Sequence, residues 1–440
     1  MGAIWIALDD TDSPRGGCTT YVLTEVIRTA RELGHDLIGL PRLVRLNPNI
    51  PWKTRGNAAL AARFGRGRGA RQLVGRLGGR PVWAYAKGGR LSKDAAARLR
   101  AAAWARVVAL APTGEPDTDP AMVASERRPP SGLYDRAVRS VVEPRDVEPE
   151  LLGIGAELRT LGSRRGLVGA AAALAWPARR VTFELITYRP PERWGTPRRV
   201  DAREVRAAAA RHPELFLCYD PRTRRLLVAP HTACPILYGL RSVDPRVARR
   251  ALRELTHSEP WERWILLVTN QGTGDHLRPG RFSGLGPYES ARVDGRLARD
   301  PVARRGGHVE FDLTDDDGTT RTCLAFEPTK TLPGAAQRLR RGDRVRVWGS
   351  RGASMEVRLE GLQLLRRASM VAGERPPACP TCRRQMHSLG RGRGFRCERC
   401  RSRRPPEAAV PFGRPPPFPR GRIDPTPSAR RHLAPLGPEP

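Results

Sequence analysis

Two pairs of cysteines near the C-terminal end constrain the fold of this chain more than any other feature. They form two CxxC motifs on either side of a Gly/Arg-rich loop: Cys379 with Cys382, and Cys397 with Cys400. This spacing can place four thiolates tetrahedrally around one zinc ion, whereas a redox pair needs a single CxxC motif. Four thiolates leave no open coordination position, so this zinc is structural. We therefore predict a zinc ribbon over residues 375–403.

The charge of the chain indicates a polyanionic partner. Lys and Arg number 78 against 45 Asp and Glu, for a formal net charge of +33. Codon bias in a GC-rich genome explains the preference for Arg over Lys, but it does not explain the surplus of bases over acids. Nucleic acid is the partner that such a surplus favours. The residues predicted to contact RNA are Lys330 of the motif EPTK and the ribbon residues Arg391, Arg393 and Arg396.

Residues 280–368 have the alternating pattern of a small β-barrel. Five segments of period two follow one another along the chain, with one short helix between the third and the fourth. This order is typical of an OB-fold, and other small antiparallel barrels share it. The tail over residues 404–440 is rich in Pro and Arg, lacks the periodicity of a core, and is expected to be extended and to become ordered on a partner.

Residues 1–265 alternate predicted strands and helices, which favours a multidomain arrangement of α/β and α+β type. Near the start we predict a strand over 3–8, a helix over 19–34, a helix over 52–65 and a Gly/Arg-rich loop over 66–80, and further on a helix over 147–161. No segment has the length and apolarity of a membrane span. The chain is therefore expected to be soluble and cytoplasmic.

Three carboxylates follow the first predicted strand in close succession: Asp9, Asp10 and Asp12. One Asp would suffice for a turn and a helix cap, whereas three at the end of a strand suit Mg²⁺ on a triphosphate. Thr19 and Thr20 begin the next predicted helix, where unpaired backbone N–H groups favour phosphate. The chain has no GxxxxGK[ST] motif, so an ATP site here is not a Walker P-loop.

Other residues are candidates for the same chemistry. Lys53 is one of only four lysines and is predicted to contact a phosphate or the substrate. Gly166 and Gly169 of the stretch GSRRGLVGA suit a phosphate cradle, although close helix packing needs the same glycines. Asn270, Gln271 and His276 are interpreted as hydrogen-bonding groups beside a base or a ribose.

Taken together, these motifs resemble the archaeal 2-agmatinylcytidine synthetase family, which acts on the minor isoleucine tRNA with a CAU anticodon. The resemblance covers nearly the whole chain. Besides the CxxC pairs, it is carried by the stretches DDTDSPRGGCTTY, RLVRLNPNIPWKTRGNAA, GLVGA, TFELITYR, PHTACPILYGLR, TNQGTGDHL, EPTK and PTPSARRHLAPL. Many separate motifs in one order make it specific.

The resemblance implies four modules and a tail. They are an ATP-using kinase-like domain (1–62 and 118–180), a ferredoxin-like domain (63–117 and 181–265), an OB-fold (280–368), a zinc ribbon (375–403) and the tail (404–440).

It also implies the reaction. ATP phosphorylates the C2 oxygen of the wobble cytidine, and agmatine then displaces that phosphate to give 2-agmatinylcytidine, which pairs with A and switches decoding to AUA. Mg²⁺ on Asp9, Asp10 and Asp12 would neutralise the triphosphate. The threonine that the family phosphorylates corresponds to Thr19. Agmatine carries a guanidinium, for which Glu184 or Asp201 is the expected acceptor.

One departure from the family pattern concerns the NQGT loop, where an acid often follows the Thr. Here Gly274 takes that place and Asp275 follows, which leaves the role of this carboxylate open. The sequence indicates no obligate protein partner.

The sequence leaves two alternatives. A non-catalytic protein that binds single-stranded nucleic acid through its barrel and ribbon would explain the charge, but not the acidic cluster. Another ATP-dependent RNA-modifying enzyme would explain both features.

Overall fold

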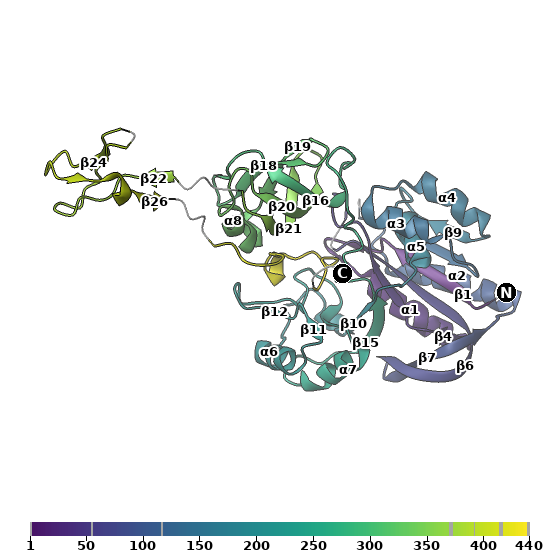
Figure 1. The fold of residues 1–440 in the computed structure, drawn as a ribbon. Coiled ribbons are helices and arrows are strands. Elements are labelled where there is room, and N and C mark those ends of the chain that lie inside the picture. Colours follow the sequence, from purple (N-terminus) through teal and green to yellow (C-terminus); the bar gives the residue numbers. More distant parts are fainter. Residues whose placement is uncertain are drawn as a thin grey trace.

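The computed structural model describes residues 2–53, 56–115, 118–368, 373–390, 392–412 and 417–437. Within these residues, one 11-stranded sheet organises the N-terminal half, in the order β11-β14-β10-β15-β5-β6-β1-β8-β9, with β4 and β7 paired beside β6 (Figure 1). Its strands are β1 (Ile4–Asp9), β4 (Asp36–Ile38), β5 (Arg42–Arg45), β6 (Ala58–Leu77), β7 (Arg80–Gly89), β8 (Ala121–Ser125), β9 (Glu157–Thr160), β10 (Thr182–Tyr188), β11 (Leu215–Phe216), β14 (Ile236–Ser242) and β15 (Arg263–Thr269).

Alternate residues of β1 separate two hydrophobic cores, because successive side chains of a strand point to opposite faces. Ile4, Ile6 and Leu8 pack into one core, and Trp5 and Ala7 pack into the other. The first core is covered by α1 (Thr19–Glu32) and α2 (Lys93–Leu110), and the second by α3 (Ser131–Arg139), α4 (Pro144–Gly153) and α5 (Gly166–Ala175). A third core lies under α6 (Ala202–Arg211) and α7 (Pro245–Glu254).

Several local predictions are confirmed. The predicted strand 3–8 is β1, and the predicted helix 19–34 is α1. Two short hairpins complete this half: β2 (Asp12–Ser13) with β3 (Gly16–Gly17), and β12 (Tyr219–Asp220) with β13 (Arg225–Leu226).

The predictions of a helix over 52–65 and a loop over 66–80 are wrong. β6 runs from Ala58 to Leu77 and pairs with β7 across a tight turn. Its first residues lie between β1 and β5 and are mostly buried, so they show no alternation of polar and apolar side chains. In a short apolar run of alanines, that pattern is also compatible with a helix.

The helix predicted over 147–161 is correct only in its first half. α4 ends at Gly153, and β9 follows at Glu157–Thr160. Gly155 has a φ of +73°, a left-handed conformation that stops a helix and that glycine adopts without steric cost.

The second half of the chain contains a closed barrel. β16 (Ser290–Leu297) pairs with both β20 (Arg344–Arg351) and β18 (Val309–Asp315), and β19 (Thr320–Ala325) pairs in parallel with β21 (Val357–Arg366). The short β17 (Val302–Ala303) pairs with β18. α8 (Thr331–Ala336) lies between the third and fourth barrel strands, which confirms the predicted order.

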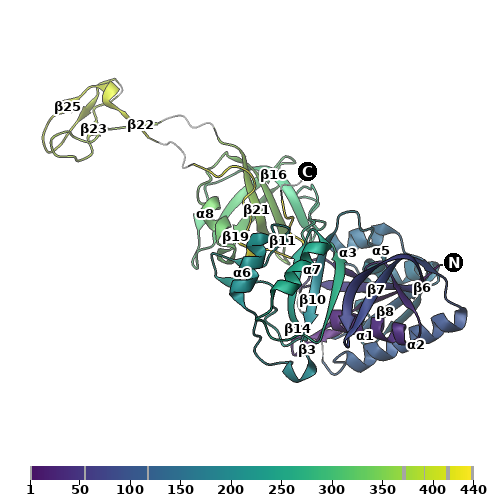
Figure 2. The ribbon, with the colours of Figure 1, turned by 90° about the horizontal axis from the view of Figure 1, so that it is seen from below.

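The zinc ribbon stands apart from the rest of the molecule at one end (Figures 1 and 2). It contains β23 (His387–Ser388), β24 (Phe395–Arg396) and β25 (Arg403–Arg404), and a pair of strands leads into and out of it: β22 (Gly373–Arg375) and β26 (Val410–Phe412).

The tail does not extend away from the protein. From residue 417 it returns along the barrel, where Ile423 and Leu362 exchange backbone hydrogen bonds, and it reaches the N-terminal half. There Leu433 is buried in the second core. The described part of the tail is therefore ordered by contacts with the rest of the same chain.

The division of residues 1–265 into two domains stays a prediction. β6 crosses the boundary predicted between residues 62 and 63, and one sheet joins both parts. Among the described residues, no helix combines the length and the apolarity that a membrane crossing needs.

Candidate functional site

A cavity of about 490 Å³ opens where β1 ends and where α1 and α5 begin. Residues from both halves of the chain line it. The predicted residues among them are Asp9, Asp10, Asp12, Thr19, Thr20, Lys53, Gly166, Gly169 and Glu184. The structure therefore brings the acidic cluster, the threonines, the lysine and the glycines to one place.

The three aspartates lie at the C-terminal end of β1. Asp9 ends the strand, and the backbone turns at Asp10, whose φ is +56°. Burial raises the pKa of Asp9 well above its usual value, and the neighbouring Asp10 adds to this. Burial and Asp12 raise the pKa of Asp10 to about 7. Asp9 and Asp10 are thus withdrawn from water and close to other carboxylates, and both effects disfavour their charged forms. A cation beside them would stabilise the charged forms.

The aspartates fit a magnesium ion that is shared with a phosphate. Among the described residues, only the four ribbon cysteines bring at least three ligand atoms of Cys, His, Asp or Glu within 4.8 Å of one another. The aspartates do not form such a group. Mg²⁺ usually takes one or two carboxylates and completes its shell with phosphate oxygens and water, so it does not need three converging carboxylates.

Two helix N-termini border the same cavity. Thr19 and Thr20 occupy the first turn of α1, and Gly166 and Gly169 lie in the first turn of α5. The unpaired N–H groups of such turns favour phosphate. The cavity therefore combines carboxylates for a metal ion with donors for the phosphates that the metal would neutralise.

The two glycines are also needed for close packing. A Cβ atom on Gly169 would collide with the carboxylate of Asp9. A Cβ atom on Gly166 would lie 2.6 Å from the backbone oxygen of Asp119, whose own N–H group donates to Asp10 over 3.3 Å. The packing interpretation of the two glycines is therefore confirmed, since the close approach of α5 holds the aspartates at the cavity, and the phosphate cradle stays a prediction.

Two cationic groups line the same cavity as the aspartates. Lys53 lines the cavity and its Nζ donates to the backbone oxygen of Ile50 over 2.8 Å. Arg165, just before α5, lies 5.0 Å from the centre of the Trp52 ring, and its charge lowers the pKa of Asp10 in part. Arg165 and Trp52 were not predicted as site residues, although both stand inside the stretches GSRRGLVGA and RLVRLNPNIPWKTRGNAA.

The cavity lining also contains a buried charge network, which together with His432 we call the histidine end of the cavity. Glu184 of β10 lies 3.5 Å from Arg45 and 3.2 Å from Arg241, and accepts a hydrogen bond from the side chain of Gln271. His432 of the tail also lines this end. Arg45, Arg241 and His432 were missed, because they come from three distant segments of the chain and no local pattern connects them.

Other candidates lie outside the cavity lining. Asp201 caps α6, where its carboxylate accepts from the backbone N–H groups of Arg203 (2.7 Å) and Glu204 (3.0 Å). Lys330 lies on the barrel and its Nζ is 2.5 Å from Glu327.

The residues that we interpreted as base or ribose contacts are buried and bonded within the protein. Asn270 donates to the hydroxyl of Tyr134 over 2.7 Å, and His276 lies 3.0 Å from Glu360. Asp275, whose role was open, accepts from Tyr134 over 2.6 Å and joins the loop to α3.

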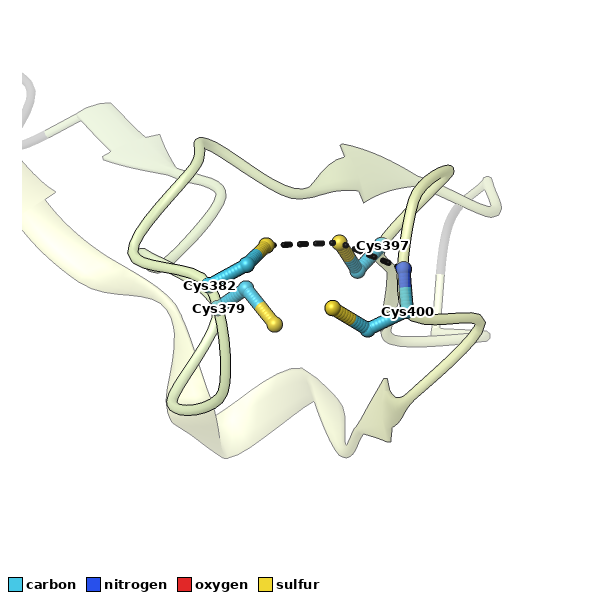
Figure 3. Close-up of side chains that lie close together, drawn as sticks. All are labelled: Cys379, Cys382, Cys397 and Cys400. Carbon is cyan, nitrogen blue, oxygen red and sulfur yellow. Dashed lines mark hydrogen bonds between the residues drawn. The ribbon is translucent and has the colours of Figure 1, made fainter.

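The four ribbon cysteines converge as predicted. Their sulfur atoms lie within 4.8 Å of one another and point toward a common centre (Figure 3). Hydrogen bonds from Ser402 and from the backbone of Cys382 lower the pKa of Cys379, whereas the neighbouring Cys382 and burial raise the pKa of Cys400. The set fits tetrahedral zinc. Arg393 is exposed and Arg396 half-buried, whereas Arg391 lies outside the described residues.

Comparison with known families matches three regions of the chain. Residues 5–163 match the model of the TiaS TCKD domain, residues 164–276 that of the TiaS FLD domain, and residues 376–414 that of the TiaS C-terminal zinc ribbon domain.

Individual relatives match over the full length. The tRNA 2-agmatinylcytidine synthetase TiaS of Methanopyrus kandleri is 35% identical over 98% of this chain and 95% of its own. A crystal structure of TiaS in complex with an isoleucine tRNA and ATP superposes with a TM-score of 0.82 at 31% identity, covering 99% of this chain and 96% of the other. A complex of TiaS with the same tRNA, AMPCPP and agmatine gives 0.78 at 29% identity, with the same coverage. The chain belongs to the TiaS family of tRNA 2-agmatinylcytidine synthetases.

Proposed function

We propose that this protein joins agmatine to the wobble cytidine of the minor isoleucine tRNA, the one with a CAU anticodon, in a reaction that consumes ATP. The observation that carries the proposal is the cavity, in which three aspartates meet two helix N-termini. Full-length relatives named for this reaction, one of them crystallised with an isoleucine tRNA, an ATP analogue and agmatine, support it.

The N-terminal end of the cavity suits the triphosphate. The first turn of α1 presents backbone donors, and Lys53 and Arg165 add positive charge; in α5 the N–H groups of Leu167 and Val168 already donate to the backbone oxygens of Arg164 and Arg165. Asp9, Asp10 and Asp12 would hold Mg²⁺, which supplies neutralisation of phosphate charge when bound. The role of the chain is then to fix the direction of the phosphates and to exclude water from them.

The chemistry that we propose has two steps. A carbonyl oxygen is a poor leaving group, so phosphorylation of the C2 oxygen of cytidine by ATP must come first. The amine of agmatine then attacks C2, and phosphate leaves with the oxygen. ATP and one water therefore end as AMP and two phosphates, one released from C2 and one from the ADP that the phosphoryl transfer leaves. Thr19, at the first position of α1, borders the cavity with its backbone at the helix N-terminus, and we propose it as the site that receives a phosphoryl group.

The modules have matching tasks in this proposal. The N-terminal half would combine a kinase-like and a ferredoxin-like domain, and the barrel would be an OB-fold. The barrel and the ribbon would hold the tRNA through Lys330, Arg393 and Arg396. With tRNA as its substrate, the enzyme would act in the cytoplasm.

We do not propose Glu184 or Asp201, the two carboxylates predicted from the sequence, as the acceptor for the guanidinium of agmatine. Asp201 caps a helix away from the cavity, and Glu184 is already paired with two arginines.

Incubation with the minor isoleucine tRNA, ATP and agmatine tests the proposal. Mass spectrometry of the anticodon loop is expected to show agmatine on the wobble cytidine, and AMP is expected only when both tRNA and agmatine are present. A protein that only binds single-stranded RNA would retain the tRNA and form no AMP. AMP formation with a different amine, and none with agmatine, would point to another RNA-modifying enzyme.

A further inference from the structure

The histidine end of the cavity is named for a residue that the tail brings in. His432 lies well beyond β26 along the chain, in the part of the tail that returns to the N-terminal half. Its backbone oxygen accepts from Gly272 over 2.8 Å, and that of the next residue, Leu433, accepts from Gly274 over 2.7 Å. Leu433 is buried in the second core. His432 is therefore held in place by its backbone and its neighbour, and its side chain is left to face the cavity.

A chain of hydrogen bonds fixes which nitrogen of this imidazole carries the proton. The amide nitrogen of Gln271 donates to Glu184, so the amide oxygen faces Nδ1 of His432, at 3.2 Å. An amide oxygen only accepts, which assigns the hydrogen to Nδ1. Arg45, burial and Arg241 hold the pKa of His432 well below its usual range, so the ring is neutral. Its Nε2 is then a fixed acceptor.

The charges around Nε2 disfavour a cationic ligand. Glu184 contributes one negative charge, whereas Arg45 and Arg241, which flank it, contribute two positive ones. The neutral imidazole adds none. This end of the cavity therefore carries a surplus of positive charge, and an ammonium or a guanidinium would be repelled there. A neutral group that offers an N–H donor suits it.

We propose that Arg45, Glu184, Arg241 and His432 form the subsite for the target base, in which Nε2 of His432 accepts a hydrogen bond from the 4-amino group of cytosine, while the buried Gln271 orients the imidazole from behind. The inference rests on the proposed function and goes beyond it by assigning the two ends of the cavity to different substrates: the aspartate end to ATP and the histidine end to the base.

The subsite gives a reason for choosing cytosine over uracil. Uracil has an oxygen at position 4, which would face the lone pair of Nε2 without a hydrogen between them. A site built to receive an N–H group rejects an analogue that lacks it, because the acceptor is left unpaired. A minor isoleucine tRNA with U in place of the wobble cytidine is therefore expected to compete for the wild-type enzyme at least tenfold less well than the natural tRNA.

Two variants of His432 test the roles of its two ring nitrogens separately. The amide nitrogen of His432→Asn replaces the Nδ1–H donor to Gln271 and leaves nothing at Nε2. His432→Gln places an amide near the position of Nε2. His432→Asn is expected to raise the KM for tRNA at least tenfold with an unchanged KM for agmatine, and His432→Gln to recover part of the loss and to accept the U-containing tRNA more readily. Ser428→Ala, in the same tail but outside the cavity lining, is the matched control and should behave like the wild type.

The other possible results for these variants also decide whether His432 binds the base. An increase in the KM for agmatine alone would overturn the assignment and place the amine at this end. Wild-type kinetics in His432→Asn would show that the histidine only supports the loop. If a variant does not fold, as judged by its melting curve, competition by the U-containing tRNA for the wild-type enzyme still decides, since equal competition overturns the proposal. Failure of the proposed function itself would look different, because the wild type would then form no modified cytidine.

Discussion

The zinc ribbon and the cavity are both sites where the sequence predicts a metal ion, and they are built in opposite ways. The ribbon takes its four ligands from one short stretch, 379–400, and its sulfur atoms already converge. The cavity takes its walls from segments that range from Asp9 to His432, and its carboxylates do not converge in this way.

This difference corresponds to two different tasks. A closed set of thiolates stabilises a small fold with little hydrophobic core, so it has no reason to leave a position open. Desolvated carboxylates beside a cavity are costly for the fold, as the raised pKa values of Asp9 and Asp10 show, and they gain a favourable partner only when a charged substrate arrives. Loss of the ribbon should therefore impair binding of the tRNA, and changes at the aspartates should impair chemistry.

The largest expected effect comes from Asp10→Ala. If the aspartates hold the metal–triphosphate unit, AMP formation should fall about 10³-fold, a loss typical of a group that stabilises transition-state charge. Binding of tRNA, measured by filter retention, should change less than twofold. Asp201→Ala is the matched control: it removes a helix cap outside the cavity, costs about 1 kcal/mol of stability and leaves ATP turnover intact. Normal turnover in Asp10→Ala would remove the metal assignment.

A smaller loss is expected from Gly169→Ala. The added Cβ atom would displace the carboxylate of Asp9, and a misplacement of about 1 Å costs on the order of 10²-fold in rate. Gly132→Ala in α3 provides the control, since a Cβ atom there meets nothing within 4 Å. Replacing glycine by alanine in a helix stabilises the fold by about 0.5–1 kcal/mol. Steady-state assays and melting curves of both variants check this. Equal activities would show that the contact between Gly169 and Asp9 has no role in the reaction.

A substitution in the ribbon is expected to weaken tRNA binding and to leave ATP turnover intact, the reverse of the effect of Asp10→Ala. Cys397→Ser leaves three thiolates for the zinc and is expected to unfold the ribbon alone, because the cysteines and Met386 dominate its small core. Affinity for tRNA should fall about tenfold, since only a few of the phosphate contacts are lost. The melting temperature of the N-terminal half should remain unchanged. A fall in ATP turnover at saturating tRNA would contradict the separation of tasks.

The smallest effect concerns the pH dependence of stability. Arg45, burial and Arg241 hold the pKa of His432 below its usual value, so the unfolded chain binds a proton at a pH at which the folded chain does not. The contribution of His432 to stability therefore falls as the pH decreases below about 6.5, by about 1 kcal/mol between about pH 7 and 5.5, while the raised pKa values of Asp9 and Asp10 act in the opposite sense over the same range. Denaturant titrations at both pH values should show that His432→Asn lacks this loss. His387→Asn, an exposed ribbon histidine, is the control and should keep it. The same pH dependence in His432→Asn and in the wild type would contradict the prediction.

The cavity could be predicted only in part. Asp9, Asp10, Asp12, Thr19 and Thr20 stand close together along the chain, and a strand that ends before a helix already places them side by side. Arg45, Arg241 and His432 join them only through the fold, since β5, β14 and the tail have no pattern that links them. The position of the tail could be predicted least of all, because a segment without periodicity does not indicate the surface on which it becomes ordered.

The sequence by itself determined the features that depend on near neighbours along the chain: the zinc ligands, the order of the barrel strands and the acidic turn after β1. Only the tertiary structure decided that residues 58–77 form a long strand, that Glu184 is paired with two arginines, and that the tail supplies a histidine to the cavity. The physical reason is that metal spacing and strand alternation are local constraints. Burial on both faces of a sheet and pairing of distant charges depend on which segments the completed fold brings together.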